Sequence, residues 1–361
     1  MEFDSTKNYI TTPDALKELI TLVKKAKIMA LDTEFTRRTT YYPILSIIQV
    51  GVIDSKKNKQ LFIIDPATGL DLKNFYKLIA SSRIIKILHS CAQDLQIFHK
   101  DSGLMPKAII DTQIMANFCG LGFSVGYSRL VEDLFDETLD KGPQKSNWQI
   151  RPLSQSQIEY AVMDVFYLEE IYEQFKVILK QKKRAKWFVE EVDNFIEKTL
   201  LRTDENLSKN FAFRGKNAKE ITQINHLVLV REKWARKLDK PRQHVIKDEV
   251  IDDLVMGRKV SVKIRKDIMP DIREVLDKQE KYRDKNDLKE GRSIMNAEQK
   301  NTYLEAKKLL NNVALAENLK EQVLITSSDL KQIICDKKLF KKIVGGWRNK
   351  VFGKELKKII Y

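Results

Sequence analysis

Two acidic residues close an apolar run near the N-terminus. Residues 28–36 read Ile-Met-Ala-Leu-Asp-Thr-Glu-Phe-Thr, which fits a buried strand that ends in Asp32 and Glu34. Residues two apart on a strand point to the same face, so the two carboxylates converge. They repel each other and burial adds a desolvation cost, so a divalent cation between them would explain the pair. An isolated Asp-x-Glu more often faces solvent at a strand end, and only further residues decide between the two interpretations.

A second acidic group lies further along the chain. Asp94 falls in an expected helix over residues 92–100, and Tyr160 and Asp164 fall in an expected helix over residues 154–173. Because Tyr160 and Asp164 are four residues apart, the phenol and the carboxylate project from one helical face. A tyrosine at that spacing more often forms the edge of a core. His89, five residues before Asp94, could act as a general base, but a structural role is favoured.

An irregular loop over residues 139–152 brings cations and one aromatic ring together. It carries Lys141, Lys145, Trp148 and Arg151 among a glycine and two prolines. Such a loop could grip a nucleic-acid backbone and stack a base, which makes these four residues candidates for nucleic-acid binding. The alternative has equal weight: the loop is a lid packed by Trp148, and its cations are solvated.

The elements that must position these residues alternate along the first half of the chain. Apolar periodicity and turn signals predict strands around the acidic run and helices between them. The expected helices cover residues 15–26, 71–80, 111–119 and 128–135, and the expected strands cover residues 44–52, 61–64 and 84–88. This order predicts a mixed α/β domain whose sheet begins with a hairpin.

The four carboxylates and the tyrosine, taken in chain order, resemble the DEDD exonuclease superfamily in its tyrosine-bearing subclass. Further motifs of the first half resemble the ribonuclease D family: Thr40-Tyr-Tyr-Pro43, Asp111-Thr-Gln113, Leu139-Asp-Lys141, Trp148 and Arg151-Pro-Leu153. The chain departs from the family at Gly142 and Asn147, where Ser and Asp are more usual. The resemblance implies a ribonuclease H-like mixed sheet with flanking helices.

The same resemblance implies a role for each site residue. Asp32 would bridge two divalent ions, Glu34 and Asp164 would help hold the ion that activates water, and Asp94 would serve the other. Carboxylates are the hard ligands that Mg²⁺ and Mn²⁺ prefer, and two such ions suit phosphodiester hydrolysis. A phenol with a pKa of about 10 is a poor base at neutral pH, so Tyr160 would orient the attacking water.

The positive charge of the chain belongs to its second half. The net charge is +15 over 361 residues, with 22 Lys and Arg against 22 Asp and Glu up to residue 180, and 43 against 28 afterwards. A neutral half followed by a basic half indicates a catalytic unit joined to a part that meets a polyanion. Generic solubility is the alternative, and an anionic membrane would need basic amphipathic helices with aromatic anchors.

Several classes of protein are excluded by what the sequence lacks. The longest apolar run, residues 44–53, is too short to span a bilayer, and no secretory signal is visible. Three cysteines without paired or metal-ligand spacing suit a reducing compartment, so a cytoplasmic protein is expected. The Gly-Lys pairs at residues 215 and 353 lack the remaining residues of a Walker loop, so no nucleotide cofactor is expected.

The second half is expected to be helical and to divide into three parts after a catalytic domain over residues 1–176. A charged helical connector covers residues 177–207. Residues 208–288 resemble an HRDC domain, a helical nucleic-acid-binding module, through the basic run over residues 231–242. Residues 289–361 resemble a second, divergent copy, with Gly345-Gly-Trp-Arg348 near its end.

The resemblance implies a monomeric, metal-dependent 3′-to-5′ exoribonuclease. Its substrates would be the 3′ ends of tRNA precursors and other structured, 3′-tailed RNAs, with 5′-mononucleotides as products. The alternative is a 3′-to-5′ exodeoxyribonuclease that acts on DNA ends in repair. A scaffold without activity would be expected to have lost at least one acid, and all four are present. The neutral first half predicts that a chain cut near residue 205 would still degrade a short single-stranded tail.

Overall fold

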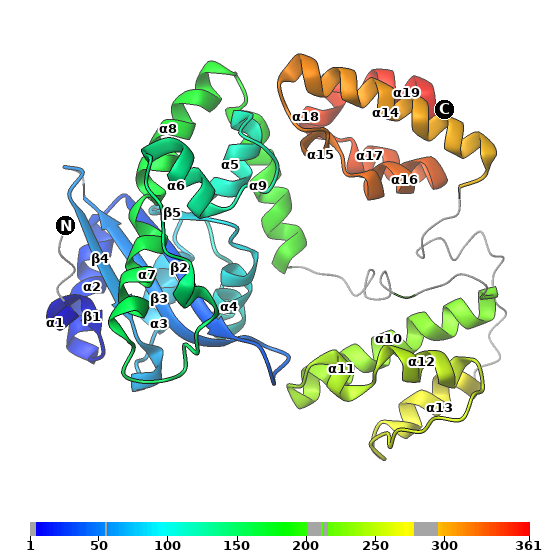
Figure 1. Ribbon diagram of the computed structural model, residues 1–361, viewed down its shortest axis with the longest axis horizontal. Coiled ribbons are helices and arrows are strands. Elements are labelled where there is room, and N and C mark those ends of the chain that lie inside the picture. The colour runs from blue at the N-terminus through cyan, green and yellow to red at the C-terminus, as the bar shows by residue number, and fades with distance from the viewer. Residues whose placement is uncertain (1–4, 55, 201–210, 212–215, 278–294) are drawn as a thin grey trace.

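The computed structural model describes the whole chain apart from residues 1–4, 55, 201–210, 212–215 and 278–294. Its N-terminal domain is built on a six-stranded mixed sheet with the order β1-β4-β3-β2-β5-β6 (Figure 1). The strands are β1 (Tyr9–Ile10), β2 (Ile28–Thr36), β3 (Ile44–Ile53), β4 (Lys59–Ile64), β5 (Ile85–Leu88) and β6 (Ile109–Asp111). The predicted mixed α/β domain is therefore confirmed, and β3 and β4 form the expected antiparallel hairpin. The sheet does not begin with that hairpin, because the short strand β1 precedes it; β1 and β6 are strands that the sequence did not indicate.

Strand β2 lies inside the sheet and is buried on both faces. It pairs antiparallel with β3 and parallel with β5. Alternate side chains enter different cores: Met29 and Leu31 join one hydrophobic cluster and Ala30 joins the other. Because neighbours on a strand point to opposite faces, Asp32 and Glu34 share the face of Ala30.

Helices cover both faces of this sheet. The side of Met29 and Leu31 packs against α2 (Pro13–Lys25), α3 (Lys73–Ile79) and α4 (Ala92–Ser102). The other side packs against α5 (Thr112–Cys119), α7 (Gln155–Phe166) and α8 (Leu168–Gln181), with α6 (Tyr127–Phe135) and α9 (Ala185–Leu200) beyond. The single helix expected over residues 154–173 is divided into α7 and α8 at Tyr167, which lies outside both helices.

Gly51 lets α7 approach the sheet closely. A Cβ atom at this position of β3 would lie 3.1 Å from the Cβ of Ala30 and 3.8 Å from the carbonyl oxygen of Val165. A larger residue would crowd Ala30 and push against the α7 backbone next to Asp164. The glycine therefore helps to hold α7 beside the acidic end of β2.

The second half forms two helical units. The first helical unit, residues 216–277, contains α10 (Ala218–Leu238), α11 (Arg242–Val245), α12 (Asp248–Val255) and α13 (Met269–Asp277). The second helical unit, residues 295–361, contains α14 (Ala297–Glu317), α15 (Glu321–Leu324), α16 (Ser327–Cys335), α17 (Phe340–Ile343), α18 (Gly346–Arg348) and α19 (Lys354–Ile360). Short helical turns complete the chain at α1 (Ser5–Asn8), η1 (Pro66–Thr68), η2 (Gly142–Lys145), η4 (Lys337–Leu339) and η5 (Asn349–Gly353).

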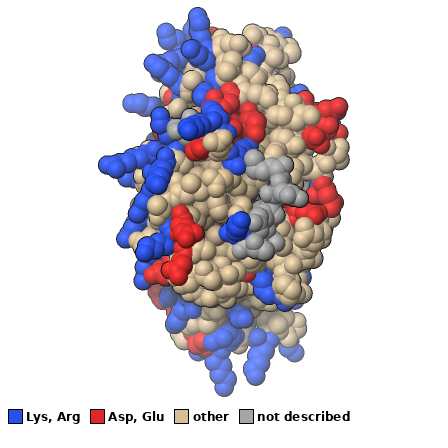
Figure 2. Space-filling model, turned by 90° about the vertical axis from the view of Figure 1, so that its left-hand side faces the viewer, with Lys and Arg blue, Asp and Glu red and all other residues tan. Residues whose placement is uncertain are grey.

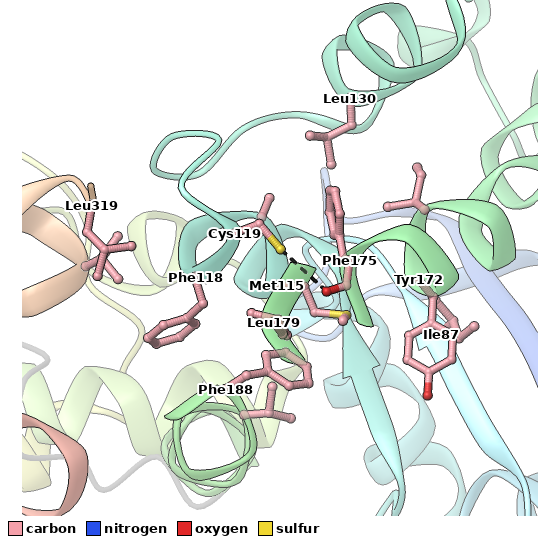
Figure 3. Close-up of a cluster of buried hydrophobic side chains, with 14 of the residues drawn as sticks. Ile87, Met115, Phe118, Cys119, Leu130, Tyr172, Phe175, Leu179, Phe188 and Leu319 are labelled. Atoms are coloured by element: carbon pink, nitrogen blue, oxygen red, sulfur yellow. Dashed lines mark hydrogen bonds between the residues drawn. The ribbon is translucent and has the colours of Figure 1, made fainter. Parts of the chain in front are cut away.

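The second helical unit shares a core with the N-terminal domain. The indole of Trp347 stacks on Trp187 of α9, with ring centroids 4.9 Å apart, and meets the edge of Phe118 of α5 at 5.4 Å. Leu319 reaches toward Phe118 in the same cluster (Figure 3). Helix α9 is thus a packed element, and not only the connector expected over residues 177–207. A chain cut near residue 205 would leave Trp187 and Phe118 without Trp347, and its cleavage of a short single-stranded tail stays a prediction.

In the part of the chain that the structure describes, no helix is long and apolar enough to cross a bilayer. Cys91, Cys119 and Cys335 all lie within the described residues, and none of them forms a disulfide there.

Candidate active site

The acidic end of β2 faces α7. Asp32 lies opposite Gln49 of β3, and Glu34 lies opposite Ile47, where the β2–β3 register shifts between Glu34 and Phe35. Such a bulge re-aims side chains locally. Helix α7 crosses the same face and carries Asp164. Strand β2 and helix α7, which lie far apart in the chain, thereby bring three of the expected acids to one place.

Asp94 joins the group from the first turn of α4. Its side chain is buried, and its Oδ1 atom accepts a hydrogen bond from the hydroxyl of Thr33, the residue between Asp32 and Glu34. Burial raises the pKa of Asp94 to about 6, while the Thr33 hydrogen bond opposes that rise. Thr33 therefore ties the start of α4 to the acidic strand.

Tyr160 and Asp164 face the acids from α7, as their spacing predicts. This helix begins at a capping box in which Ser154 and Gln157 satisfy each other's backbone groups. The Tyr160 hydroxyl donates a hydrogen bond to the Asp164 carboxylate. Burial raises the pKa of Asp164 to about 7, and the hydrogen bond from Tyr160 opposes that rise.

The carboxylates act on one another electrically. The pKa of Asp32 is held well above its ordinary value, first by burial and then by the charges of Asp94, Asp164 and Glu34. Burial and then the charges of Asp164 and Asp94 raise the pKa of Glu34 to about 8. The charges of Asp94 and Asp164 therefore raise the cost of ionising Asp32 and Glu34, so the site concentrates negative charge that a cation would relieve.

The chemistry of these donors fits a divalent metal. Four carboxylates offer only hard oxygen ligands, the set that Mg²⁺ and Mn²⁺ prefer. Among the described residues, however, no three His, Cys, Asp or Glu side chains already stand in a geometry that would hold one ion together. As placed, Asp94 and Asp164 instead accept hydrogen bonds from Thr33 and Tyr160. The four carboxylates therefore fit such a metal by the chemistry of their oxygen atoms.

Trp148 and Arg151 have structural contacts that the sequence left open. Trp148 is only 3% exposed, and its indole packs on the Tyr160 ring with centroids 5.9 Å apart. This favours the alternative interpretation, in which Trp148 packs the loop, over base stacking in the present arrangement. Arg151 also points inward, where its Nη1 atom donates to the carbonyl of Trp148 at 2.7 Å.

Arg151 is held by a buried ion pair. Its Nε and Nη2 atoms lie 2.5 and 2.8 Å from the two carboxylate oxygens of Asp65, and Nη2 also donates to the carbonyl of Ser46 at 2.9 Å. Burial raises the pKa of Asp65, but the hydrogen bonds from Arg151 and Tyr9 outweigh it and leave the pKa below its ordinary value. The expected contact of Arg151 with nucleic acid is corrected, because its guanidinium is already occupied. Lys141 and Lys145 are exposed and stay candidates.

Arg151→Ala should therefore lower stability rather than RNA affinity. Removal of the guanidinium leaves the buried Asp65 carboxylate without its cation, which costs about 2 to 4 kcal/mol. We expect a lower melting temperature with an unchanged salt dependence of RNA binding. Lys145→Ala is the matched change on the same loop and should leave the melting temperature unaltered. If Arg151→Ala kept full stability and lost RNA affinity, the direct-contact interpretation would be restored.

Three features of the site were missed by the sequence argument. Thr33 and Asp65 were not assigned a role, although a threonine between two acids and an acid before Pro66 were visible. Gln49 interrupts the apolar run over residues 44–53, yet its side chain is fully buried beside Asp32, and neither amide atom has a partner among the described residues. The signal for Gln49 was a lone amide within a strand of apolar residues.

His89 behaves as the structural residue that was favoured. Its Nδ1 atom lies 2.9 Å from the hydroxyl of Thr112, and burial lowers its pKa. A neutral, buried ring that is tied to the start of α5 is suited to support, not to proton transfer.

Comparisons with known proteins agree with this geometry. Residues 8–180 match the protein family described as 3′-5′ exonuclease. The chain is 32% identical over 249 residues to ribonuclease D of Bartonella henselae, a match that covers 68% of this chain and 60% of that protein. The match to ribonuclease D of Acidiphilium cryptum covers 62% of that relative, so the chain spans about three fifths of the length of these two proteins.

Solved structures with the same fold extend over both halves. The crystal structure of Escherichia coli RNase D, described as an exoribonuclease involved in structured RNA processing, has a TM-score of 0.83 at 24% identity and covers 100% of this chain and 99% of its own. A protein from Bifidobacterium adolescentis has a TM-score of 0.68 at 18% identity and covers 98% of this chain and 96% of its own. At these identities the likeness shows the fold.

One relative covers nearly the full length. Ribonuclease D of Zymomonas mobilis is 30% identical over 371 residues, which cover 96% of this chain and 92% of that protein. The acids at the end of strand β2, the tyrosine-bearing helix α7 and this nearly full-length match lead to one conclusion: the chain belongs to the ribonuclease D family.

Proposed function

We propose that this chain is a metal-dependent 3′-to-5′ exoribonuclease that shortens tRNA precursors and other structured, 3′-tailed RNAs and releases 5′-mononucleotides. The observation that carries the proposal is the placement of Asp32, Glu34, Asp94 and Asp164 together beside Tyr160, at the point where the end of β2 meets α4 and α7. Membership of the ribonuclease D family supports the choice of RNA. The described fold of the Escherichia coli relative, named as an exoribonuclease, supports it further.

Asp32, Glu34, Asp94 and Asp164 would hold two Mg²⁺ or Mn²⁺ ions. When bound, such ions lower the pKa of water and neutralise the leaving oxygen of a phosphodiester. The four residues themselves must first lose their protons. Their raised pKa values mean that protons and cations compete for the same oxygens near neutral pH.

Tyr160 would orient the attacking water. Burial, together with the charges of Asp164, Glu34 and Asp32, raises the pKa of its phenol, so the hydroxyl keeps its proton at physiological pH. A neutral phenol accepts or donates a hydrogen bond but does not remove a proton at that pH. The packing of Trp148 against the Tyr160 ring fixes the direction of the hydroxyl.

Tyr160→Phe tests this role. The variant keeps the ring against Trp148 and removes only the hydroxyl, so we expect turnover to fall about 10²-fold, in line with the loss of one catalytic hydrogen bond. Metal affinity, followed by calorimetry, should stay unchanged. A variant that loses metal affinity in the same proportion as turnover would contradict the orienting role.

The two helical units would hold the body of the RNA as HRDC-type domains, over residues 208–288 and 289–361. Their charge supports this: the 22 Lys and Arg before residue 181 are balanced by 22 acids, and the excess follows. Figure 2 shows the side of the molecule formed by the N-terminal domain, where Lys and Arg gather along one edge and acids interrupt the rest.

We assign the protein to the cytoplasm and take it to act as a monomer.

The second helical unit carries a dense group of exposed lysines. These lysines are Lys331, Lys337, Lys338, Lys341, Lys342, Lys350, Lys354, Lys357 and Lys358. Each phosphate that they neutralise releases counterions, and binding then weakens as salt rises. We name these nine residues the lysine cluster.

Replacement of Lys341, Lys342, Lys357 and Lys358 by Gln should flatten the salt dependence of binding to a 3′-tailed tRNA. The log-log slope should fall by up to about 2.8 to 3.6, at about 0.7 to 0.9 for each of the four lost contacts. Turnover of a short oligoribonucleotide should change little.

The control replaces four exposed lysines of the N-terminal domain, and it removes the same charge. The matched residues are Lys17, Lys24, Lys25 and Lys77. Equal effects of the two variants on the salt slope would mean that net charge, and not the lysine cluster, determines RNA affinity.

Digestion of matched RNA and DNA tests the proposed function. Both substrates carry a single-stranded 3′ tail and a 5′ label, and each is incubated with Mg²⁺, Mn²⁺ or EDTA. We expect a ladder of shortened RNA with mononucleotide release, and no reaction in EDTA. Preferential digestion of the DNA would replace the proposal by a 3′-to-5′ exodeoxyribonuclease, and endonucleolytic products would overturn both.

A further inference from the structure

The Thr40-Tyr-Tyr-Pro43 motif has no part in the chemistry described above, yet it makes an extensive polar contact between the N-terminal domain and the first helical unit. The loop of residues 37–43 follows β2 directly, so it begins three residues beyond Glu34. Five hydrogen bonds join Tyr41 and Tyr42 of this loop to α10, α11 and the residue that caps α10. The contact therefore begins on the strand that carries the catalytic acids.

Tyr41 is buried inside the core of the first helical unit. Its side chain is 9% exposed and belongs to the same hydrophobic cluster as Leu227, Trp234 and Ile251. A residue of one domain that completes the core of another links the two more tightly than a surface contact does. Removal of the ring would leave a cavity in that core.

The Tyr41 hydroxyl is fixed by charged partners. It donates to Glu232, which is 2% exposed, and it accepts from the Nε atom of Arg236 at 3.2 Å. Arg242 pairs with Glu232 and lies over the Tyr41 ring at 5.2 Å. Burial raises the pKa of Glu232, but the hydrogen bonds from Arg242 and Tyr41 outweigh it, so the carboxylate stays ionised as an acceptor. Charge-assisted hydrogen bonds of this kind set a defined geometry.

Asp239 accepts hydrogen bonds from the backbone of the loop. Its Oδ1 atom accepts from the amides of Tyr41 and Tyr42 at 3.0 and 2.9 Å. Asp239 ends α10 in the left-handed conformation, with φ of 47°. A single carboxylate oxygen that receives two successive amides fixes the orientation of the loop as well as its distance.

We propose that Tyr41, Tyr42, Glu232, Asp239 and Arg242 form a latch that holds the first helical unit in a fixed position relative to strand β2, and that Tyr41 is a positioning residue for folded RNA. The inference rests on the proposed function. When the helical unit binds the body of an RNA, the latch fixes the distance between that body and the catalytic acids. The 3′ tail of the same RNA then reaches the acids as an intramolecular substrate. A short oligonucleotide needs no such alignment. The latch thereby sets the preference for large, structured substrates over short ones.

Two variants break the latch from opposite sides. Tyr41→Ala removes the ring and hydroxyl from the loop. Asp239→Gly removes the carboxylate, and the left-handed conformation that it leaves is the one glycine adopts most easily, so α10 keeps its end. Thr39→Ala changes an exposed residue of the same loop and serves as the matched control.

Kinetics on two substrates tests the proposal. For Asp239→Gly and Tyr41→Ala we expect kcat/KM on a 3′-tailed tRNA to fall about tenfold, because a fixed geometry no longer supplies the effective concentration of the tail. The same variants should cleave a short oligoribonucleotide within about twofold of the parent, and Thr39→Ala should match the parent on both substrates. Equal losses on the two substrates, or no loss on the tRNA, would overturn the latch.

Hydrogen exchange gives a readout that does not depend on activity. In Asp239→Gly the amides of Tyr41 and Tyr42 lose their acceptor and should exchange faster than in the parent and in Thr39→Ala. Unchanged exchange at these two amides would overturn the latch even if the tRNA kinetics changed. If the parent protein failed to cleave any RNA, the proposed function would fall, while the exchange rates would still decide whether the loop and α10 are joined.

Discussion

Asp32→Asn is expected to lower turnover of RNA by about 10³-fold or more, the equivalent of several kcal/mol of transition-state stabilisation. The pKa of Asp32 is raised by burial and then by the charges of Asp94, Asp164 and Glu34, so its carboxylate belongs to the same acidic group as theirs. The amide keeps the size of the side chain and removes its charge. RNA binding at equilibrium should stay close to that of the parent, since the helical units are untouched.

The same variant should make the metal-free protein more stable. The folded-state pKa values of Asp94, Asp164 and Glu34 are raised to about 6, 7 and 8, above those of the unfolded chain. Protons therefore favour the folded state at low pH, and the metal-free parent loses stability as pH rises from about 4 to 8. Asp32→Asn removes a carboxyl group whose own folded-state pKa is held well above that of the unfolded chain, so it should flatten this loss, which thermal melts in EDTA would measure. A variant that is less stable than the parent at pH 8 would contradict the electrostatic account.

Trp347→Ala has the largest expected effect on stability. Its indole is 2% exposed and lies between Trp187 and Phe118, and its backbone amide donates to the carboxylate of Glu190 at 3.1 Å. Truncation of a buried tryptophan costs about 3 to 5 kcal/mol. Because the cavity would open between the second helical unit and the N-terminal domain, both should lose protection from proteolysis together. Denaturant unfolding measures the loss.

Leu315→Ala is the control for the tryptophan. Leu315 lies on α14 of the same helical unit but is 80% exposed, so its truncation should change the free energy of unfolding by less than about 0.5 kcal/mol. Equal costs for the two variants would mean that the shared core contributes no more than the surface. If Trp347→Ala unfolded only the second helical unit and left the N-terminal domain at its original midpoint, the two would be independent, as the sequence alone suggested.

The sequence was sufficient wherever local pattern determined the outcome. A nine-residue apolar strand ending in Asp32 and Glu34 can present both acids on only one face, and the spacing of Tyr160 and Asp164 does the same on a helix. The order of helices and strands in the first half followed from hydrophobic periodicity and capping residues. The main error there was one long helix in place of α7 and α8, because the division at Tyr167 has neither proline nor glycine to signal it.

Contacts between distant residues could not be predicted in this way. Nothing near Arg151 indicates that its guanidinium reaches Asp65, 86 residues earlier, so a basic loop residue was taken for a phosphate contact. Local sequence does not distinguish an exposed cation from one that is buried and paired. The contacts of Tyr41 and Trp347 were missed for the same reason, because their partners Glu232 and Trp187 lie in other units of the chain. The fold class was therefore predicted from the sequence, while the roles of individual side chains depended on long-range contacts that only the structure shows.

The central claim is that the four carboxylates hold the divalent ions required for cleavage. Anomalous diffraction from crystals soaked in Mn²⁺ together with a 5′-mononucleotide tests it most directly, with Asp32→Asn crystals treated in parallel. We expect Mn²⁺ peaks among Asp32, Glu34, Asp94 and Asp164 in the parent and the loss of these peaks in the variant. An absence of peaks at these residues, at a Mn²⁺ concentration that supports full cleavage in solution, would contradict it.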